Sequence, residues 1–183
     1  MIKGTGWITQ KKYGCQKRRL QQGYPDLKSL YSRLQPEIFR YPVENFFRFD
    51  AISKLSAISI ALALFDAKMT YWPGKKQDIS ILGTSTSGAL EANLAYFNDY
   101  IDNGRNLARG NLFIYTLPSS FLAEAAIHFG LTGKLLYLGF TTNTETKSLK
   151  YALNMLKTEI HKTIILVNAG PKAATCYILQ KSK

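Results

Sequence analysis

The sequence predicts an α/β protein in which helices cover both faces of a mixed, mainly parallel sheet, as α-β-α layers. Short apolar runs alternate with longer segments whose apolar residues recur every three or four positions, the pattern of strands alternating with helices. Glycines such as Gly104 and Gly130 follow the periodic segments and predict their ends. With 183 residues, 46% hydrophobic and 20% charged, the chain fits one globular domain over 1–183.

The first strand is expected at 2–8, IKGTGWI, where glycines close it. Residues 10–30 form a basic, turn-rich segment that predicts a connection without regular structure. A helix is expected at 50–69, because apolar residues there recur at three- and four-residue steps and Asp50 can cap its first turn. Its many alanines indicate a deeply buried helix, which the segment YWPG ends.

The second half of the chain continues the alternation of strands and helices. A strand at 78–83 and the loop TSTSG lead into a helix at 89–104, whose one apolar face consists of Leu90, Leu94, Phe97 and Ile101. The remaining elements are expected in this order: a helix at 117–130, a strand at 134–140, a helix from 142 to 160, and strands at 162–169 and 173–180 that form an antiparallel hairpin at the sheet edge. Thr142 and Glu145 have the spacing of a capping box.

The chain carries 24 basic and 12 acidic residues, a formal charge of +12, which favours an acidic partner. Five cations between the first strand and Tyr24 are most simply a solvated loop, and they are also the best candidate for contact with an anionic partner: Lys11, Lys12, Lys17, Arg18 and Arg19. Cys15 and Cys176 lie far apart without metal-ligand spacing, so neither a metal site nor a cofactor is expected.

No apolar run is long enough to span a membrane, and the N-terminus lacks the apolar core of a secretory signal, so a cytoplasmic protein is expected. The segment GTSTSGAL at 83–90 has the two glycines of a phosphate-binding loop, but Ala89 and Leu90 replace its lysine and hydroxyl residue. Nucleotide binding is therefore not predicted. His128 and His161 have no spacing that pairs them with a nucleophile, and a structural role is favoured for both.

Five segments, in order, resemble the N-terminal half of β-ketoacyl synthases, the condensing enzymes of the thiolase fold: IKGTGWIT, FRFDAISKLSAISIALALFDA, ISILGTSTSG, YTLPSSFLAEAAIHFGLTGK and the elbow GKLLYLGFTTNTETKSLKYAL. The resemblance covers nearly the whole chain and implies a thiolase-like half-fold. In the family, an acylated cysteine begins the helix after the central strand. That position falls at Thr142, or at Thr141, and a threonine hydroxyl accepts acyl groups poorly because it is hardly ionised at neutral pH. The family's two enolate-stabilising histidines belong to a C-terminal half without a counterpart in residues 1–183.

The resemblance implies a non-catalytic subunit, similar to a chain length factor, of type II fatty-acid, polyketide or aryl-polyene synthesis. Its partners would be an acyl carrier protein, a full-length ketosynthase or a second copy of the chain. The implied acyl or anion site is the elbow, residues Thr141, Thr142, Asn143 and Thr144. The basic cluster would contact the carrier protein, and the strand Leu135, Leu136, Tyr137 and Leu138 would pair across a dimer axis.

Two other functions stay open. The first is a residual acyltransferase or thioester hydrolase that uses Thr141, Thr142 or Thr144 with a histidine as base. The second is a nucleic-acid-binding protein that uses the basic cluster, for which affinity would fall steeply with salt; this function is the less favoured.

Overall fold

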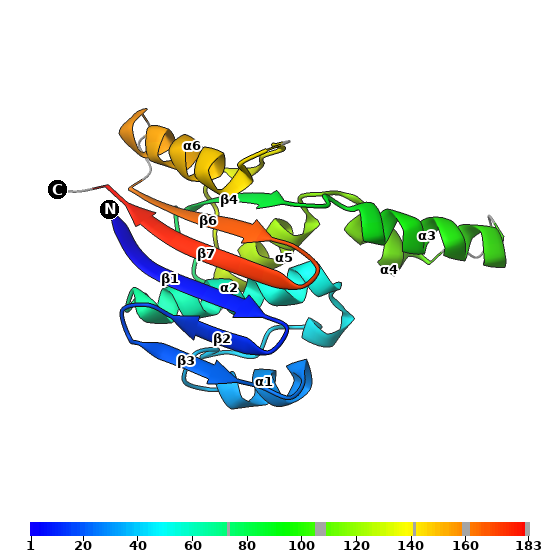
Figure 1. The fold of residues 1–183 in the computed structure, drawn as a ribbon, viewed down its shortest axis with the longest axis horizontal. Helices are drawn as coiled ribbons and strands as arrows, with labels where there is room; N and C mark the ends of the chain where they lie inside the picture. The colour runs from blue at the N-terminus through cyan, green and yellow to red at the C-terminus, as the bar shows by residue number, and fades with distance from the viewer. Residues whose placement is uncertain (73, 105–108, 141, 159–161, 182–183) are drawn as a thin grey trace.

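A computed structural model describes residues 1–72, 74–104, 109–140, 142–158 and 162–181. Within them, seven strands form one open sheet in the order β3-β2-β1-β7-β6-β4-β5, with helices on both faces (Figure 1). The strands are β1 (Ile2–Thr9), β2 (Lys12–Cys15), β3 (Leu20–Gly23), β4 (Ser80–Ser85), β5 (Leu135–Tyr137), β6 (Thr163–Ala169) and β7 (Ala173–Gln180). The helices are α1 (Leu27–Leu34), α2 (Ala51–Asp66), α3 (Leu90–Asn103), α4 (Gly110–Phe113), α5 (Ser120–Phe129) and α6 (Thr144–Thr158), with 3₁₀ turns at Phe46–Arg48 and Ile114–Thr116.

The mixed sheet and the α-β-α layers confirm the predicted fold class, but the balance of strand directions differs from the expectation. β4 runs parallel to β5 and to β6, whereas the other four neighbouring pairs are antiparallel. The β6–β7 hairpin was expected at the edge, and it lies inside the sheet because β1 pairs with β7 along nearly its whole length. The prediction that the sheet is mainly parallel is therefore wrong, whereas the other parts of the predicted fold class hold.

Residues 10–30 were expected to be an irregular connection, and they instead contain the β2–β3 hairpin and the first half of α1. Tyr13 packs into the core from β2, and the backbone pairs Lys12 with Gly23 and Cys15 with Leu20. The sequence did not predict this hairpin. Its lysines, glutamines and glycines leave no clear alternation of apolar and polar residues, and lysine and glycine are depleted in strands. Asp26 caps α1 by accepting a hydrogen bond from the Ser29 backbone N–H at 2.9 Å.

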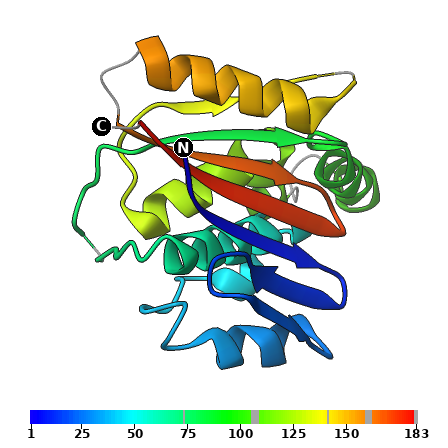
Figure 2. The ribbon, with the colours of Figure 1, turned by 60° about the vertical axis from the view of Figure 1, so that its left-hand side comes forward.

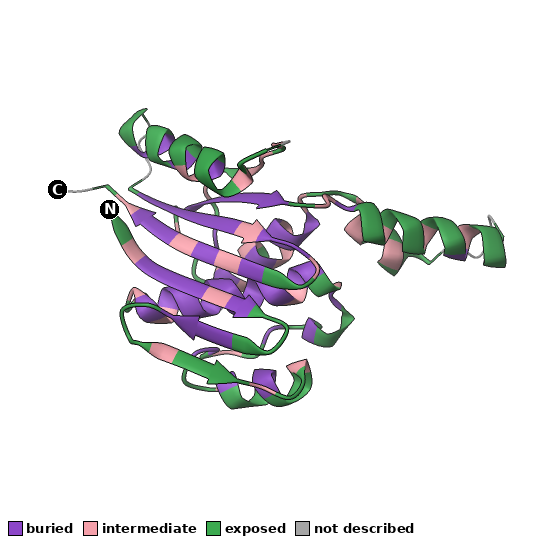
Figure 3. Ribbon diagram, viewed as in Figure 1, coloured by how far each residue is buried: buried purple, intermediate pink, exposed green. Residues whose placement is uncertain are grey.

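Helix α2 is buried on nearly all sides, which confirms the deeply buried helix predicted from its alanines (Figure 3). Asp50 caps it as predicted, accepting from the Ser53 backbone N–H at 2.8 Å. The sheet lies very close to this helix, because a Cβ on Gly6 would come within 2.2 Å of the Ser59 carbonyl oxygen. Only glycine permits that approach, so β1 and α2 share one tightly packed layer boundary.

The two faces of the sheet carry different helices. α1, α2 and α5 cover one face, whereas α6 packs on the other over β4, β6 and β7, where Leu82, Ile164 and Leu166 meet Ala152 and Leu156 (Figure 2). α5 ends at Gly130, whose left-handed φ of 66° closes it as predicted. Among the described residues no single helix is long and apolar enough to cross a membrane. The segments Gly110–Thr116 and Ser120–Phe129 pass on length and composition only together, with a bend of 101° between them.

Helix α6 begins at Thr144, two residues later than predicted. The expected capping box between Thr142 and Glu145 is replaced by other contacts. The Thr142 hydroxyl accepts from Lys147 Nζ at 3.2 Å, and the Glu145 carboxylate accepts from the Tyr177 hydroxyl at 2.5 Å. Asn143 precedes the helix with a left-handed φ of 51°, and its backbone carbonyl oxygen accepts from the Lys147 backbone N–H at 3.0 Å. Asn143 therefore occupies the position before the first turn that the spacing assigned to Thr142.

Helix α3 projects from the body of the molecule, and α4 lies beside it (Figure 1). The apolar face predicted for this helix exists, and it points away from the protein. Leu90, Leu94, Phe97 and Ile101 are 57%, 52%, 57% and 60% exposed. An amphipathic helix ordinarily turns its apolar face to the core, so this helix is inverted with respect to the usual arrangement.

Candidate functional site

A cavity of about 500 Å³ lies where the carboxyl ends of β4 and β6 meet the first turn of α6. Three segments line it: residues 84–86 at the end of β4, Thr144 and Glu145 of α6, and residues 168–175 around the β6–β7 turn. Parallel strands end at the same edge of a sheet, and ligands of open α/β folds commonly bind there. The N-terminal end of α6, whose backbone N–H groups carry a partial positive charge, lies at the same edge (Figure 2).

Two side-chain donors in the cavity wall have no hydrogen-bond partner in the described part of the chain: Thr84 Oγ1 and Asn168 Nδ2. Thr84 is only 1% exposed. Asn168 is held by its other end, since the Ser148 hydroxyl lies 2.9 Å from Asn168 Oδ1 and also 2.9 Å from the Glu145 carbonyl oxygen. Burying a donor without an acceptor is costly, so these two groups are suited to a ligand that accepts hydrogen bonds.

The cavity is lined by one positively charged and one negatively charged side chain. Lys172 lines it from the β6–β7 turn, and Glu145 lines it from α6. The carboxylate of Glu145 is engaged by Tyr177, whose pKa is raised first by burial and then by that carboxylate. Donors facing a site that already holds one carboxylate favour a neutral carbonyl over a second anion. Thr84, Asn168 and Lys172 were not predicted as site residues, although the glycine loop and the strands that carry them were predicted.

The predicted elbow residues are only partly brought to this cavity. Thr144 lines it, whereas Thr142 and Asn143 are exposed in the segment that leads into α6. Thr141 lies outside the described residues. The structure therefore places the start of α6, but not the Thr142 side chain, in the cavity wall.

Neither cysteine of the chain lies at the elbow. Cys15 belongs to β2 and Cys176 to β7, and both side chains are buried. Burial raises the pKa of the Cys15 thiol to about 11, with the Asp66 carboxylate contributing, and burial also raises the pKa of Cys176. Since only the thiolate is an effective nucleophile, both are poor nucleophiles at neutral pH.

His128 lies half-buried on α5 and is not a partner of the elbow. Its Nε2 lies 3.2 Å from the Tyr71 hydroxyl, and its ring packs against Tyr71, Phe129 and Phe39. Burial lowers the pKa of this imidazole to about 4. α5 and α6 lie on opposite faces of the sheet, so His128 is not the base that a threonine nucleophile requires (Figure 2). His161 lies outside the described residues.

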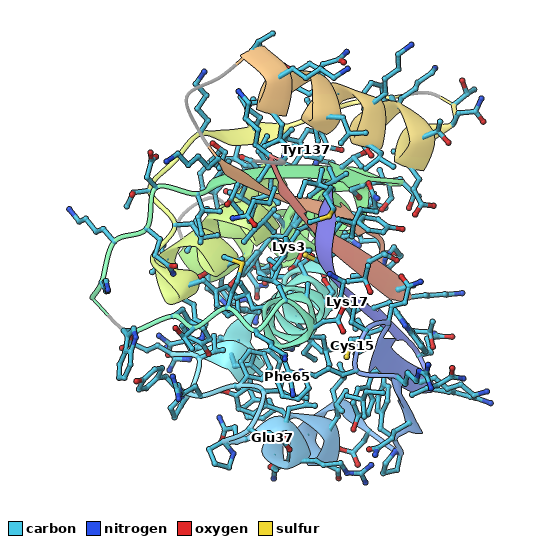
Figure 4. The ribbon with its side chains drawn as sticks, turned by 90° about the vertical axis from the view of Figure 1, so that its left-hand side faces the viewer. Lys3, Cys15, Lys17, Glu37, Phe65 and Tyr137 are labelled. Atoms are coloured by element: carbon cyan, nitrogen blue, oxygen red, sulfur yellow. The ribbon has the colours of Figure 1, made fainter. Side chains whose placement is uncertain are left out.

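The structure divides the basic cluster between two ends of the sheet. Lys11 and Lys12 follow Thr9, which pairs with Ala173 of the cavity wall, so these two lysines lie at the cavity end. Lys17 and Arg18 lie at the opposite end, near the end of α2 (Figure 4).

Two of the cations at that far end hold the β2–β3 turn in place. Lys17 Nζ donates to the Lys3 carbonyl oxygen at 2.6 Å. Arg18 Nε donates to the Phe65 carbonyl oxygen at 3.0 Å, and its guanidinium lies 3.9 Å from the centre of the Phe65 ring. Lys11, Lys12 and Arg19 are exposed. The five cations are therefore not one surface.

The strand predicted to pair across a dimer axis lies at an edge of the sheet. β5 has β4 as its neighbour, and the other edge of β5 carries no strand within the described residues. Leu135 is exposed, whereas Leu136 and Leu138 pack on the cluster beneath α6 and Tyr137 packs on Phe121. No three His, Cys, Asp or Glu side chains within the described ranges converge as metal ligands.

No family model and no curated protein matches the sequence. Solved structures match its fold over nearly its whole length. One is a ketosynthase in complex with its chain length factor from Xenorhabdus doucetiae, with a TM-score of 0.67 and 13% identity over 100% of this chain and 79% of that chain. The ishigamide ketosynthase/chain length factor has a TM-score of 0.68 and 10% identity over 99% of this chain and 62% of that chain. A β-ketoacyl synthase from Burkholderia phymatum STM815 has a TM-score of 0.67 and 11% identity over 99% of this chain and 58% of that chain. The chain thus spans between about three fifths and four fifths of these proteins. Together with the mixed sheet and its flanking helices, these similarities show that the chain has the thiolase-like fold of the ketosynthases.

Proposed function

We propose that the chain is a non-catalytic subunit, similar to a chain length factor, that works beside a ketosynthase and an acyl carrier protein. The observation that carries the proposal is the cavity at the start of α6, which keeps hydrogen-bond donors but has no thiol beside it. Two structures of similar fold are ketosynthases described together with a chain length factor, and a third is a ketosynthase in complex with an acyl-carrier protein.

The cavity supports binding of an acyl carbonyl without a covalent step. Thr84 Oγ1, Asn168 Nδ2 and the first N–H groups of α6 are all donors, and a thioester or ketone carbonyl is an acceptor that they can hold. A threonine nucleophile needs a base within hydrogen-bond reach, and the one histidine among the described residues lies on the other face of the sheet. These features favour a binding role over a residual acyltransferase or thioester hydrolase.

The carrier protein would approach the cavity end of the sheet. Lys11 and Lys12 lie at that end, and Lys172 lines the cavity itself. Acyl carrier proteins are strongly acidic, so lysines around the opening of an acyl site complement them and speed their association. Lys17, Arg18 and Arg19 belong to the β2–β3 turn at the opposite end of the sheet, so we do not expect them to contribute to the same contact.

The exposed edge of β5 would pair with a ketosynthase-type subunit, either a full-length synthase or a second copy. An unpaired strand edge presents free N–H and C=O groups that readily pair with another chain. Because β5 is only three residues long, the strand pairing has to be supported by side-chain contacts around Leu135.

The decisive test measures the affinity of an acylated carrier protein for the chain, alone and co-expressed with a full-length ketosynthase of the same organism. Lys11→Glu/Lys12→Glu is compared with Lys17→Glu/Arg19→Glu, which changes the net charge equally at the far end. We expect low-salt binding that the first pair weakens about tenfold or more, and that the second pair weakens much less.

Three results would overturn the proposal: no binding at low salt with or without the ketosynthase, equal loss in both double variants, or condensing activity by the chain alone. A duplex DNA of random sequence is the control ligand. If DNA bound more tightly than the carrier protein, with a steep dependence on salt, the nucleic-acid function would replace the one proposed.

A further inference from the structure

Helix α3 packs on its neighbours with its polar face. Asp99 accepts from Arg109 Nε at 2.8 Å and forms an ion pair with Arg109 Nη2 at 2.6 Å, and the Tyr96 ring packs against Phe113 at 5.5 Å. Ala92 and Ala95 border a small cavity of about 180 Å³ beside Leu112. These contacts fix the orientation of α3, so the opposite face must point outward.

That outward face is a stripe of four large apolar residues, Leu90, Leu94, Phe97 and Ile101, which we call the α3 stripe. Each is more than half exposed. With roughly 100 Å² of apolar surface per residue, the stripe exposes on the order of 400 Å², which is within the range of the largest, often functional, patches on monomers. Two such stripes facing each other would bury about 800 Å², so the residues that flank the stripes have to supply the rest of the roughly 1,000–1,200 Å² that a specific interface needs.

The spacing of the stripe specifies what kind of element fits it. The steps from Leu90 to Ile101 are four, three and four residues, the narrow seam through which one helix pairs with one other helix. The same steps are obtained when the sequence is read backwards. A second α3 helix running antiparallel therefore places Leu90 opposite Ile101 and Leu94 opposite Phe97, and all four residues of both stripes are covered.

The residues that flank the stripe permit this self-pairing. In the antiparallel register, Glu91 faces the amide side chain of Asn98 in the other helix, and Asn93 faces Tyr100. The remaining acids of the helix lie off the seam: Asp99 is paired with Arg109 on the body side, and Asp102 is directed away from the contact. No pair of like charges meets across the seam, so the usual electrostatic barrier to pairing a helix with its own copy is absent.

We propose that the α3 stripe is the contact through which two copies of this chain associate, with their α3 helices antiparallel across a twofold axis. This contact is separate from the β5 edge and does not rest on the proposed function. A twofold contact of one helix with its own copy uses the same residues twice and, taken alone, joins two chains.

The first experiment measures the molar mass of the purified chain by light scattering and sedimentation between 1 and 100 μM. We expect a dimer, and we expect Leu94→Glu/Phe97→Glu to raise the dimer dissociation constant by at least about 100-fold. Ile127→Glu is the matched control, because Ile127 is 79% exposed on α5, away from α3, and its substitution should leave the dimer intact. Circular dichroism confirms that each variant is folded.

The second experiment tests the register by oxidative cross-linking. A mixture of Leu90→Cys and Ile101→Cys chains should form a disulfide between unlike chains, whereas either variant alone should form little. The native thiols are both buried and contribute little background. The proposal is overturned if the chain is monomeric, if the dimer survives Leu94→Glu/Phe97→Glu, or if each single variant cross-links to itself. A stripe that is protected from hydrogen exchange only when a ketosynthase is present would overturn it too.

Discussion

The burial of His128 predicts how the free energy of unfolding depends on pH, in both sign and size. Burial among Tyr71, Phe39 and Phe129 lowers its pKa from 6.5 to about 4. The native state therefore holds the imidazole neutral, while the unfolded state binds a proton near pH 6.5. The contribution of His128 to the free energy of unfolding is fully present above that pH and is lost as the pH falls towards 4. One pKa unit corresponds to about 1.36 kcal/mol, so about 2 kcal/mol is lost between pH 7.5 and pH 5.

The assay is urea unfolding followed by circular dichroism at half-unit steps of pH from 7.5 to 5, at constant ionic strength. The wild-type chain is compared with His128→Gln, which cannot titrate in this range. His128→Gln should be less stable at pH 7.5 and should lose about 2 kcal/mol less than the wild-type chain on acidification.

An unchanged pH slope in His128→Gln would refute the reasoning. So would an imidazole pKa near 7 measured by NMR, because that value would contradict the burial of the His128 ring against Tyr71, Phe39 and Phe129.

The remaining predictions concern packing and the elbow. Gly6→Ala should lower the free energy of unfolding by about 1–3 kcal/mol, because its Cβ would lie 2.2 Å from a backbone oxygen of α2, whereas Gly23→Ala, with its nearest neighbour at 3.6 Å, should change it little; urea unfolding compares the two. Asp66→Ala should destabilise the chain by about 2–5 kcal/mol, because two backbone N–H groups that donate to this carboxylate at 2.9 and 3.0 Å lose their acceptor; hydrogen exchange should localise the loss to β1 and the β2–β3 turn. Thr142→Cys should be alkylated by iodoacetamide at pH 7 much faster than the two native thiols, which are buried and have raised pKa values, and equal rates by mass spectrometry would contradict the exposed elbow.

The elements that could be predicted from sequence are those whose signal is local. β4, β6 and β7 are apolar runs bounded by turn residues, and α2 combines a three- and four-residue period with the Asp50 cap. The β2–β3 hairpin was missed because its stability comes from Tyr13 packing in the core and from pairing with β1, neither of which is visible in a run of lysines and glutamines.

The direction of the α3 stripe could not be predicted either. Periodicity shows that a helix has an apolar face, but only the Asp99–Arg109 ion pair and the neighbouring turn show that this face points away from the body. For the candidate site, the elbow pattern predicted a helix that begins two residues before the observed start of α6. Thr84 and Asn168 were missed because they come together only through the parallel alignment of β4 with β6. The division of the basic cluster likewise follows from the hairpin that runs through it.

We infer that the cavity at the start of α6 binds an acyl group but offers no side chain that becomes covalently acylated. The most direct measurement is the intact mass of the chain after incubation with octanoyl-N-acetylcysteamine, with a full-length ketosynthase as the positive control. We expect an unchanged mass for this chain and the gain of one octanoyl group by the ketosynthase. An octanoyl adduct that peptide mass spectrometry places on Thr142 or Thr144 would contradict it.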